Sequence, residues 1–277
     1  MSGSYKSVRF EIADGIARFT MNQPEILNPL TDDLKDDFIR MVDEVEGNEA
    51  VRVLIIAGEG RAFSAGGNVK RMHEAAQTGV DTMAARRSLL SAHDWLERVW
   101  NLDCPVIAAV DGLAYGGGLS FALISDFVLA STRARFCCVF GRIGLVPDLG
   151  VMYTLPRIVG MQRAKELMYT ARSFGPEEAQ SLGIVHSVHE PEALMPAVDA
   201  FAARLAQGSR AALAQMKRTV NASFESSYRD IVSAEADGQA LMFTTPFNQE
   251  AVRRFVHKES PLYDWDRMVR AAGEGDD

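Results

Sequence analysis

Apolar and polar residues alternate along residues 5–22, and the spacing becomes helical soon afterwards. The stretch YKSVRFEIADGIARFTMN alternates on both sides of Asp14-Gly15, which predicts a β-hairpin with its turn at these two residues. Thr31 then precedes apolar residues at helical spacing, which predicts an N-capped helix. The apolar positions of this helix are Leu34, Phe38, Met41, Val42 and Val45.

Three almost continuous apolar runs, VRVLIIAG (51–58), PVIAAV (105–110) and DFVLAS (126–131), predict buried strands. A predicted helix over Met83–Trp100 and a short helix after residue 118 separate them. Strands that alternate with helices indicate an α/β fold with a parallel arrangement. After Gly160 helical spacing dominates, interrupted by one short predicted strand, GIVHSV (183–188). We therefore expect a β/α core over 1–190, a helical region over 191–268 and a disordered tail over 269–277.

The composition, 47% hydrophobic and 24% charged over 277 residues, is that of a globular chain with ample core material. A net charge of −8 argues against general binding to nucleic acid or to an anionic membrane. Cys104, Cys137 and Cys138 are too few for a disulfide framework, and we interpret them as reduced core residues. The N-terminus lacks the apolar region of a secretory signal, and no apolar run is long enough to span a membrane, so we expect a cytoplasmic protein.

Two predicted strands are each followed by a glycine cluster, Ser64-Ala65-Gly66-Gly67 and Gly116-Gly117-Gly118. Glycine inside an element costs about 0.5–1 kcal/mol relative to alanine, so three in a row need a reason. One reason is a pair of tight turns without a ligand. The other is an oxyanion hole, in which two backbone N–H groups converge on one oxygen and glycine lets the substrate approach closely.

Three motifs in order, GEGRAFSAGGNVKRM, PVIAAVDGLAYGGGLSFALISDFVLAS and GRIGLVPDLGVMYTLPRIVG, resemble the enoyl-CoA hydratase/isomerase (crotonase) family. The resemblance covers roughly residues 8 to 260. It implies a crotonase-like β/α spiral with a helical C-terminal trimerisation region, and a coenzyme A thioester as the ligand. It also implies that the N–H groups of Gly67 and Gly117 hold the thioester oxygen while an enolate develops.

Proton carriers decide which reaction such a hole serves. The two glutamates of the family's hydratases fall at Ser120 and at about Phe140 in this chain, so both carboxylates are missing. Asp148, in GLVPDLG, matches the acidic position that the family's isomerases use as a single base. Spacing alone also allows Asp148 to be an ordinary turn residue. The resemblance favours isomerisation of an enoyl-CoA, with Asp148 as the base.

Three alternatives stay open. One is hydration that uses a relocated base or an ordered water. Another is hydrolytic chemistry like that of the family's aromatic-acyl-CoA dehalogenases, with Asp148 as nucleophile and His93 activating water; His93 could equally be a surface or packing residue. The last is a protein that binds acyl-CoA without catalysis.

The same resemblance predicts how the coenzyme is held. Phe255 and Lys258, three apart on one face of a predicted helix, match an aromatic residue and a lysine that reach the adenine and the phosphates. Ile26, Ala62 and Ala65 lie where the family uses backbone groups against the pantetheine and adenine. We expect no metal and no tightly bound cofactor, since coenzyme A arrives as part of the substrate. The expected assembly is a homotrimer or a dimer of trimers.

Overall fold

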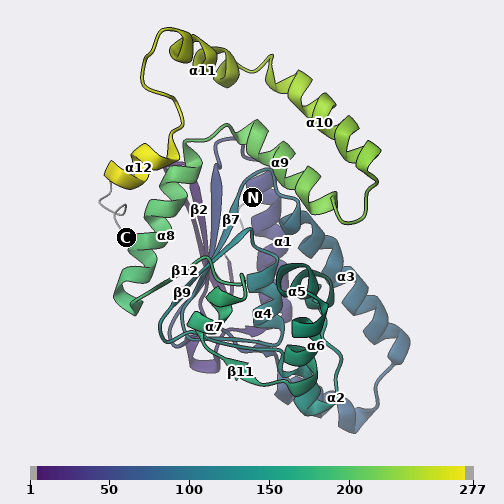
Figure 1. Ribbon diagram of the computed structural model, residues 1–277. Coiled ribbons are helices and arrows are strands. Elements are labelled where there is room, and N and C mark those ends of the chain that lie inside the picture. The colour runs from purple at the N-terminus through teal and green to yellow at the C-terminus, as the bar shows by residue number, and fades with distance from the viewer. Residues whose placement is uncertain (1–4, 272–277) are drawn as a thin grey trace.

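The computed structural model describes residues 5–271 and places a six-stranded sheet at its centre (Figure 1). The strand order is β1-β2-β4-β7-β9-β12, in which β1 and β2 are antiparallel and the other neighbours are parallel. Asp14 and Gly15 both have positive φ, 51° and 77°, as a two-residue hairpin turn requires, so the predicted hairpin is confirmed. The strands are β1 (Val8–Ala13), β2 (Ile16–Met21), β4 (Val53–Gly58), β7 (Val106–Val110), β9 (Phe127–Ser131) and β12 (Ser187–His189).

A second sheet has the order β11-β10-β8-β5, and β3 pairs with β6 beside it. Successive strands alternate between the two sheets. In each of the pairs β4 and β5, β7 and β8, and β9 and β10, the first strand belongs to the large sheet and the second to the small one. The chain therefore winds as a β/α spiral, as the resemblance implied. These strands are β3 (Pro29–Leu30), β5 (Ala62–Ser64), β6 (Gly66–Gly67), β8 (Leu113–Tyr115), β10 (Arg135–Cys137) and β11 (Ser173–Phe174).

Helices cover both faces of the large sheet. The main core lies under α1, α3 and α4 and includes the contacting rings of Phe38, Trp95 and Phe121. Thr31 caps α1 through a 3.2 Å bond that its hydroxyl accepts from the Leu34 N–H, as predicted. The helical segments of this part are η1 (Pro24–Ile26), α1 (Asp32–Glu46), α2 (Val69–Thr78), α3 (Thr82–Trp100), α4 (Gly117–Leu123), η2 (Val139–Ile143), α5 (Val151–Val159), α6 (Met161–Thr170) and α7 (Pro176–Ser181).

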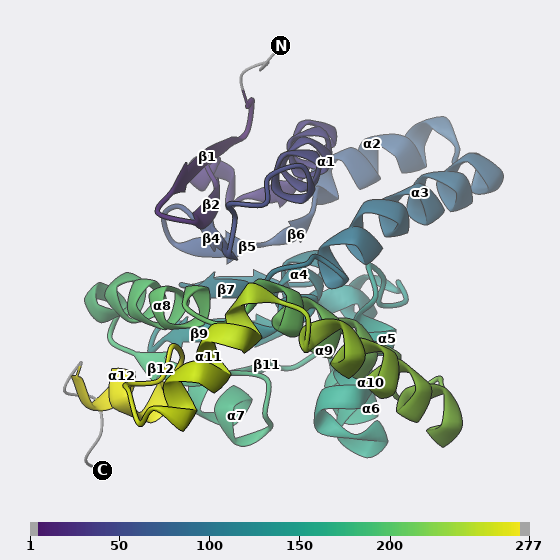
Figure 2. The ribbon, with the colours of Figure 1, turned by 90° about the horizontal axis from the view of Figure 1, so that it is seen from above.

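The C-terminal region consists of α8 (Pro191–Ala206), α9 (Arg210–Ala222), α10 (Tyr228–Met242), α11 (Pro246–Val256) and α12 (Trp265–Ala271). Helix α8 packs on the sheet face opposite α1, with Val198 and Phe201 in a second core, so it belongs to the body of the molecule. Helices α10 and α11 stand away from the body, and α11 lies at the far end from α2 (Figures 1 and 2). Gly238 is the one buried residue of α10, and α11 has none among its described residues.

Several predictions need correction. Residues 62–64 and 66–67, for which no strand was predicted, form β5 and β6, because their backbones pair with β8 and β3. The strand expected over 183–188 begins only at Ser187 and ends at His189. Residues 269–271 of the expected disordered tail belong to α12, and residues 272–277 lie outside the described range. The three cysteines are free and buried, as expected. Within residues 5–271, no helix has the length and apolar character to cross a membrane.

Candidate active site

The two glycine clusters lie in direct backbone contact. A Cβ on Gly66 would sit 2.9 Å from the Gly117 nitrogen, and a Cβ on Gly118 would overlap the Ser64 carbonyl. Gly66 and Gly116 have φ of 83° and 53°, which only glycine adopts readily. The clusters are therefore one junction between β6 and the start of α4, where a side chain at Gly66 or Gly118 would collide with backbone atoms.

The Gly117 and Gly67 amides both lie at this junction. Gly117 is the first residue of α4, so its N–H has no acceptor within the helix, whereas the Gly116 N–H is bonded to the Cys137 carbonyl at 2.9 Å. On β6, Gly66 lies opposite Pro29 in a parallel pair. The Gly66 N–H donates to the Ser64 hydroxyl oxygen at 3.1 Å, so this amide is already engaged within its own glycine cluster. Convergence of the two amides on one oxygen stays a prediction.

Asp148 lies in the loop between η2 and α5, and contacts made by its neighbours bring it to the same junction. The Ser120 hydroxyl, on α4 one turn after Gly117, donates a 3.0 Å hydrogen bond to the Asp148 carbonyl oxygen. The side chain of Leu149 reaches Gly117, where a Cβ would lie 3.0 Å from Leu149 Cδ1. The loop is thus fastened to the helix that carries the Gly117 amide.

The surroundings of the Asp148 carboxyl favour its protonated form. Asp148 is half-buried, and burial raises the pKa of its carboxyl above the ordinary 3.8. The charge of His93, on α3, opposes this rise in pKa only in part. Asp148 and His93, which lie 55 positions apart in the sequence, are therefore neighbours in the fold.

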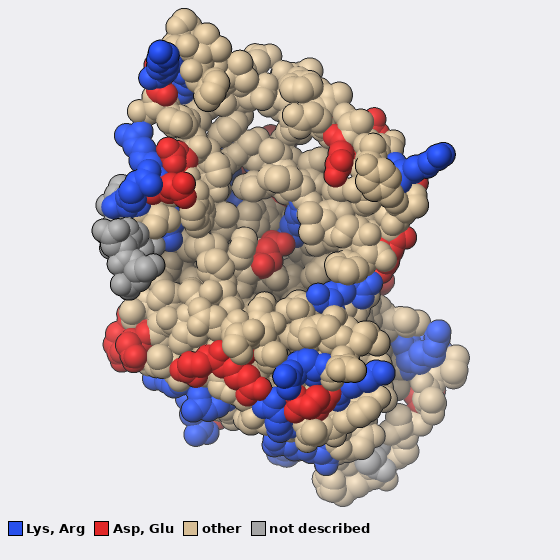
Figure 3. Space-filling model, viewed as in Figure 1, with Lys and Arg blue, Asp and Glu red and all other residues tan. Residues whose placement is uncertain are grey.

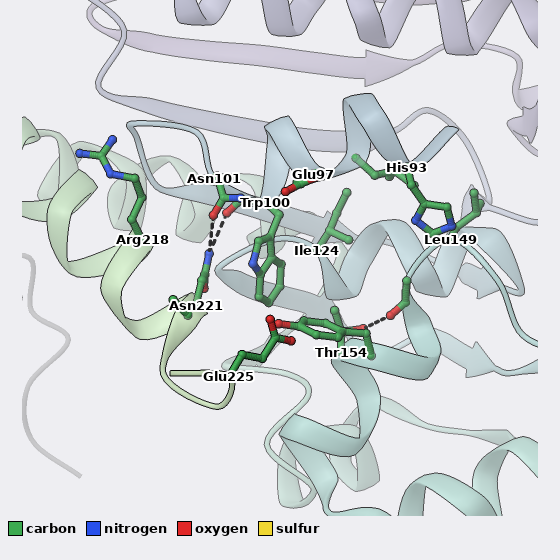
Figure 4. Close-up of a pocket in the computed structure, with 14 residues that line it drawn as sticks. His93, Glu97, Trp100, Asn101, Ile124, Leu149, Thr154, Arg218, Asn221 and Glu225 are labelled. Carbon is green, nitrogen blue, oxygen red and sulfur yellow. Dashed lines mark hydrogen bonds between the residues drawn. The ribbon is translucent and has the colours of Figure 1, made fainter. Parts of the chain in front are cut away.

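A cavity of about 520 Å³ opens beside these residues, between α3, α4, α5 and the end of α9. Figure 4 shows His93 and Leu149 at one end of it and Trp100, Asn221 and Glu225 at the other. Its lining combines apolar side chains, such as those of Leu96, Ile124 and Leu149, with at least as many polar or charged ones. Leu149 also lines a second, smaller hollow of about 130 Å³, together with Leu30, Trp95 and Phe121.

Sequence reasoning missed some residues of this cavity. Glu97 lies one helical turn after His93 on α3, and Trp100 follows on the same side. Their spacing from His93 was visible in the sequence and could have indicated them. Tyr153 and Glu225 come from α5 and from the turn after α9, and no local pattern links those segments. The Tyr153 ring stacks under the Arg157 guanidinium, which forms a 3.0 Å ion pair with Glu225.

The two positions that carry glutamate in the family's hydratases are both buried. Ser120 is fully buried, and its hydroxyl is engaged by the Asp148 carbonyl. The ring of Phe140, in η2, lies beside Gly116, where it can exclude water but cannot carry a proton. Within the described residues, no group of three or more His, Cys, Asp and Glu side chains could hold a metal ion.

The segments predicted to hold pantetheine and adenine are packed together. Asn28, which is buried, donates from its side-chain amide to the Ala62 carbonyl at 2.8 Å. The Ala65 N–H donates to the Leu27 carbonyl at 2.9 Å, so a coenzyme contact at Ala65 would have to use its own carbonyl. Ile26 is exposed at the end of η1. These contacts place the three predicted segments around one buried asparagine.

Phe255 and Lys258 require a correction. Helix α11 ends at Val256, and Lys258 follows in the left-handed region with φ of 58°, so the two residues do not share a helical face. The turn comes shortly before Pro261, which cannot continue a helix. Both residues line a separate hollow with Tyr263, and neither lines the cavity beside Asp148. Within one chain, the structure does not bring them to the glycine junction.

Comparison with known proteins defines the class of this chain. The enoyl-CoA hydratase/isomerase family model matches residues 11–266, and the chain belongs to this family. A crystal structure of an enoyl-CoA hydratase/isomerase from Cupriavidus metallidurans superimposes with a TM-score of 0.88 at 35% identity, covering 95% of this chain and 97% of the other. The protein is therefore an enzyme of the acyl-CoA-handling crotonase fold.

Two relatives show how wide the chemistry of this family is. The crotonyl-CoA hydratase of Syntrophomonas wolfei is 31% identical over 256 residues, which cover 92% of this chain and 96% of that protein. The 1,2-epoxyphenylacetyl-CoA isomerase of Escherichia coli is 30% identical over 257 residues, covering 91% and 96%. Since similar chains carry different activities, the reaction has to be inferred from the residues of this site.

Proposed function

We propose that the protein shifts the double bond of an enoyl-CoA thioester, with Asp148 as the single base. The observation that carries this proposal is the attachment of the Asp148 loop to the Gly117 helix through Ser120, while both hydratase glutamates are absent. The Asp148 carboxylate would take a proton from C2 of a 3-enoyl thioester. The electrons would shift onto the thioester oxygen, and the same proton would return at C4 as the double bond moves to C2.

The Gly67 and Gly117 N–H groups would stabilise the enolate oxygen in this scheme. One such donor typically contributes about 2.7–4 kcal/mol to the stability of the transition state. The base must also be strong enough for its task, and the raised pKa of Asp148 moves it in the useful direction. No water takes part in the reaction, which agrees with an apolar Phe140 and an occupied Ser120 hydroxyl.

The test compares Asp148→Asn with the native protein on 3-enoyl-CoA and 2-enoyl-CoA substrates. Isomerisation should fall by about a hundredfold or more, because the amide cannot accept the proton. Binding of a saturated acyl-CoA should be retained. Asp94→Asn, which changes an exposed carboxylate of α3 next to His93, is the matched control and should remain active. Unchanged isomerase activity in Asp148→Asn would reject the assignment of Asp148 as the base. Hydration of 2-enoyl-CoA by both proteins would instead favour a hydratase.

The proximity of His93 and Asp148 favours a second candidate, dehalogenase-like or hydrolytic chemistry. Asp148 would displace a leaving group and form an ester, and His93 would accept a proton from the water that hydrolyses it. Mass spectrometry after rapid quenching distinguishes the two, since only this candidate gives a covalent adduct on Asp148. If the protein neither shifts the double bond, hydrates nor exchanges a proton for solvent deuterium in any acyl-CoA tested, and no adduct forms, a protein that only binds acyl-CoA is favoured.

We further propose that the protein works as a homotrimer or a dimer of trimers, with Phe255 and Lys258 reaching the coenzyme of a neighbouring subunit. In support, α9, α10 and α11 expose many large apolar side chains, and the arch they form is largely uncharged on the face in Figure 3. These residues include Val220, Phe224, Leu241, Phe243, Val252 and Val256. Mixing inactive Asp148→Asn subunits with Lys258→Ala subunits should restore activity if the two residues act across an interface.

A further inference from the structure

Leu149 lies on the wall between two hollows. It lines the cavity of about 520 Å³ beside His93 and also the hollow of about 130 Å³ beside Leu30 and Phe121. Its side chain is 9% exposed, and Figure 4 shows it next to His93 at the end of the larger cavity. Leu149 thus separates two spaces that would otherwise adjoin.

The backbone holds Leu149 in an unusual conformation. Its φ is 52°, a left-handed value that is uncommon for leucine. Ser120 holds the carbonyl of the preceding residue, Asp148, at 3.0 Å, and the Gly150 carbonyl accepts the Tyr153 N–H at 2.8 Å. A strained conformation of this kind persists where neighbouring contacts fix it, and it clusters at functional sites. The direction of the Leu149 side chain is therefore set by the fold.

The same side chain touches the residue predicted to hold the thioester. Leu149 Cδ1 is 3.0 Å from the position that a Cβ of Gly117 would take, and Leu30 lies on the same side of Gly117. An acyl group held at the Gly117 amide would start beside Leu149. The smaller hollow beyond it is lined largely by apolar side chains, including those of Phe121 and Trp95.

We propose that Leu149 determines which acyl groups the site accepts. Its side chain closes the smaller hollow to an acyl group that lies between Gly117 and Asp148, and so selects slender, unbranched groups. A smaller residue would join the two spaces and admit longer or branched groups. This inference rests on the proposed function only in taking an acyl-CoA as the ligand at this site.

The experiment measures a ratio, which partial loss of folded protein does not change. We would determine kcat/KM for a homologous series of straight and branched 3-enoyl-CoA esters with the native protein, Leu149→Ala and Leu149→Phe. Each methylene newly buried is worth about fourfold in kcat/KM, so Leu149→Ala should raise the ratio of bulky to slender substrates by about tenfold. Leu149→Phe should lower this ratio.

Leu145→Ala is the matched control, because it makes the same truncation in the same loop at an exposed position that lines neither hollow. It should leave the ratio unchanged. A ratio for Leu149→Ala within twofold of the native value, or an equal change in Leu145→Ala, would overturn the proposal. If Leu149→Ala fails to fold, Leu149→Gly relieves the left-handed backbone at this position and should shift the ratio in the same direction; no shift there would equally overturn the proposal.

Calorimetric titration with saturated acyl-CoAs of the same series separates this inference from the proposed function. If the native protein binds these esters but isomerises none of the 3-enoyl-CoAs, the proposed function fails. A change in the chain-length dependence of Kd in Leu149→Ala would still support the proposal that Leu149 determines which acyl groups the site accepts. The same dependence in both proteins would refute it, whatever reaction the enzyme catalyses.

Discussion

The Ser120 hydroxyl donates a 3.0 Å hydrogen bond to the backbone carbonyl of Asp148, 28 residues further along the chain. Ser120 is fully buried on α4, one turn beyond Gly117. The bond therefore links the helix that begins with the candidate oxyanion donor to the loop that carries the candidate base. We infer that Ser120, at the position expected to hold a glutamate in the family's hydratases, positions the Asp148 loop.

Ser120→Ala should slow the reaction more than it weakens binding. Loss of one hydrogen bond costs only about 1 kcal/mol of stability, but a shift of the base by a fraction of an ångström acts directly on the reaction rate. We expect kcat to fall about tenfold or more, with KM changed by less than about threefold. Steady-state kinetics on a 3-enoyl-CoA checks this.

Ser131→Ala is the control for that experiment, because it also removes a fully buried hydroxyl, one bonded to Asp111 at 2.7 Å and with no contact to the Asp148 loop. Equal losses of kcat in the two variants would show that Ser120 serves the fold and does not position Asp148.

The activity should depend on pH through Asp148. A base must be ionised, and burial raises the pKa of this carboxyl above 3.8. The kcat/KM value should therefore rise with pH through a midpoint above the ordinary aspartate value. Asp148→Glu, if active, should show a displaced midpoint. A profile that is flat down to the pH at which the protein unfolds would contradict the assignment.

The same raised pKa has a consequence for stability. Between the ordinary value of 3.8 and the raised pKa, the folded protein binds more protons at Asp148 than the unfolded chain does, so its stability falls as pH rises through this window. At neutral pH the ionised, half-buried carboxylate is then a cost to the fold. We expect Asp148→Asn to melt at a higher temperature than the native protein at pH 7, and to lose that advantage toward acid pH. Differential scanning calorimetry at several pH values measures this difference.

Neighbouring glycines of α4 should respond differently to alanine. A Cβ on Gly118 would overlap the Ser64 carbonyl, which is backbone and cannot move, so Gly118→Ala should be poorly folded. A Cβ on Gly117 would meet the methyl ends of Leu30 and Leu149, which can shift. We expect Gly117→Ala to fold and to lose activity, because the shift narrows the space for the thioester. Circular dichroism with activity assays separates the two, and a folded, fully active Gly117→Ala would contradict the site.

Local patterns were sufficient for β7 and for the start of α4, but not for β5 and β6, whose pairing with β8 and β3 is not local in the sequence. The apolar run at 105–110 and the glycines after it predicted the strand and the start of α4, because burial and backbone freedom are local requirements. Leu149 was not predictable as a wall between two hollows, since nothing in its side chain indicates a left-handed backbone. The sequence also could not show that Lys258 lies away from the glycine junction. Helix α11 ends two residues before Lys258, and a helical pattern does not show where α11 lies relative to the body.

One of the ion pairs that fasten α9 to the body is largely buried. Lys217 of α9 is 8% exposed and bonds to Asp126 at 2.8 Å, while Asp126 also accepts the Val106 N–H at 2.7 Å. Asp126 thus links α9 to the strands β7 and β9. Lys217→Met would leave the carboxylate without its charge partner and should lower the free energy of unfolding by about 3 kcal/mol.

Urea denaturation measures this change, and Lys6→Met is the control. Lys6 pairs with Asp33 at the same 2.8 Å, but both side chains are more than half exposed, so its loss should leave the urea midpoint unchanged. If Lys217→Met proves as stable as Lys6→Met, the contacts of α9 hold it without the ion pair. A large loss of stability in Lys217→Met alone would show that the ion pair with Asp126 anchors α9 to the ends of β7 and β9.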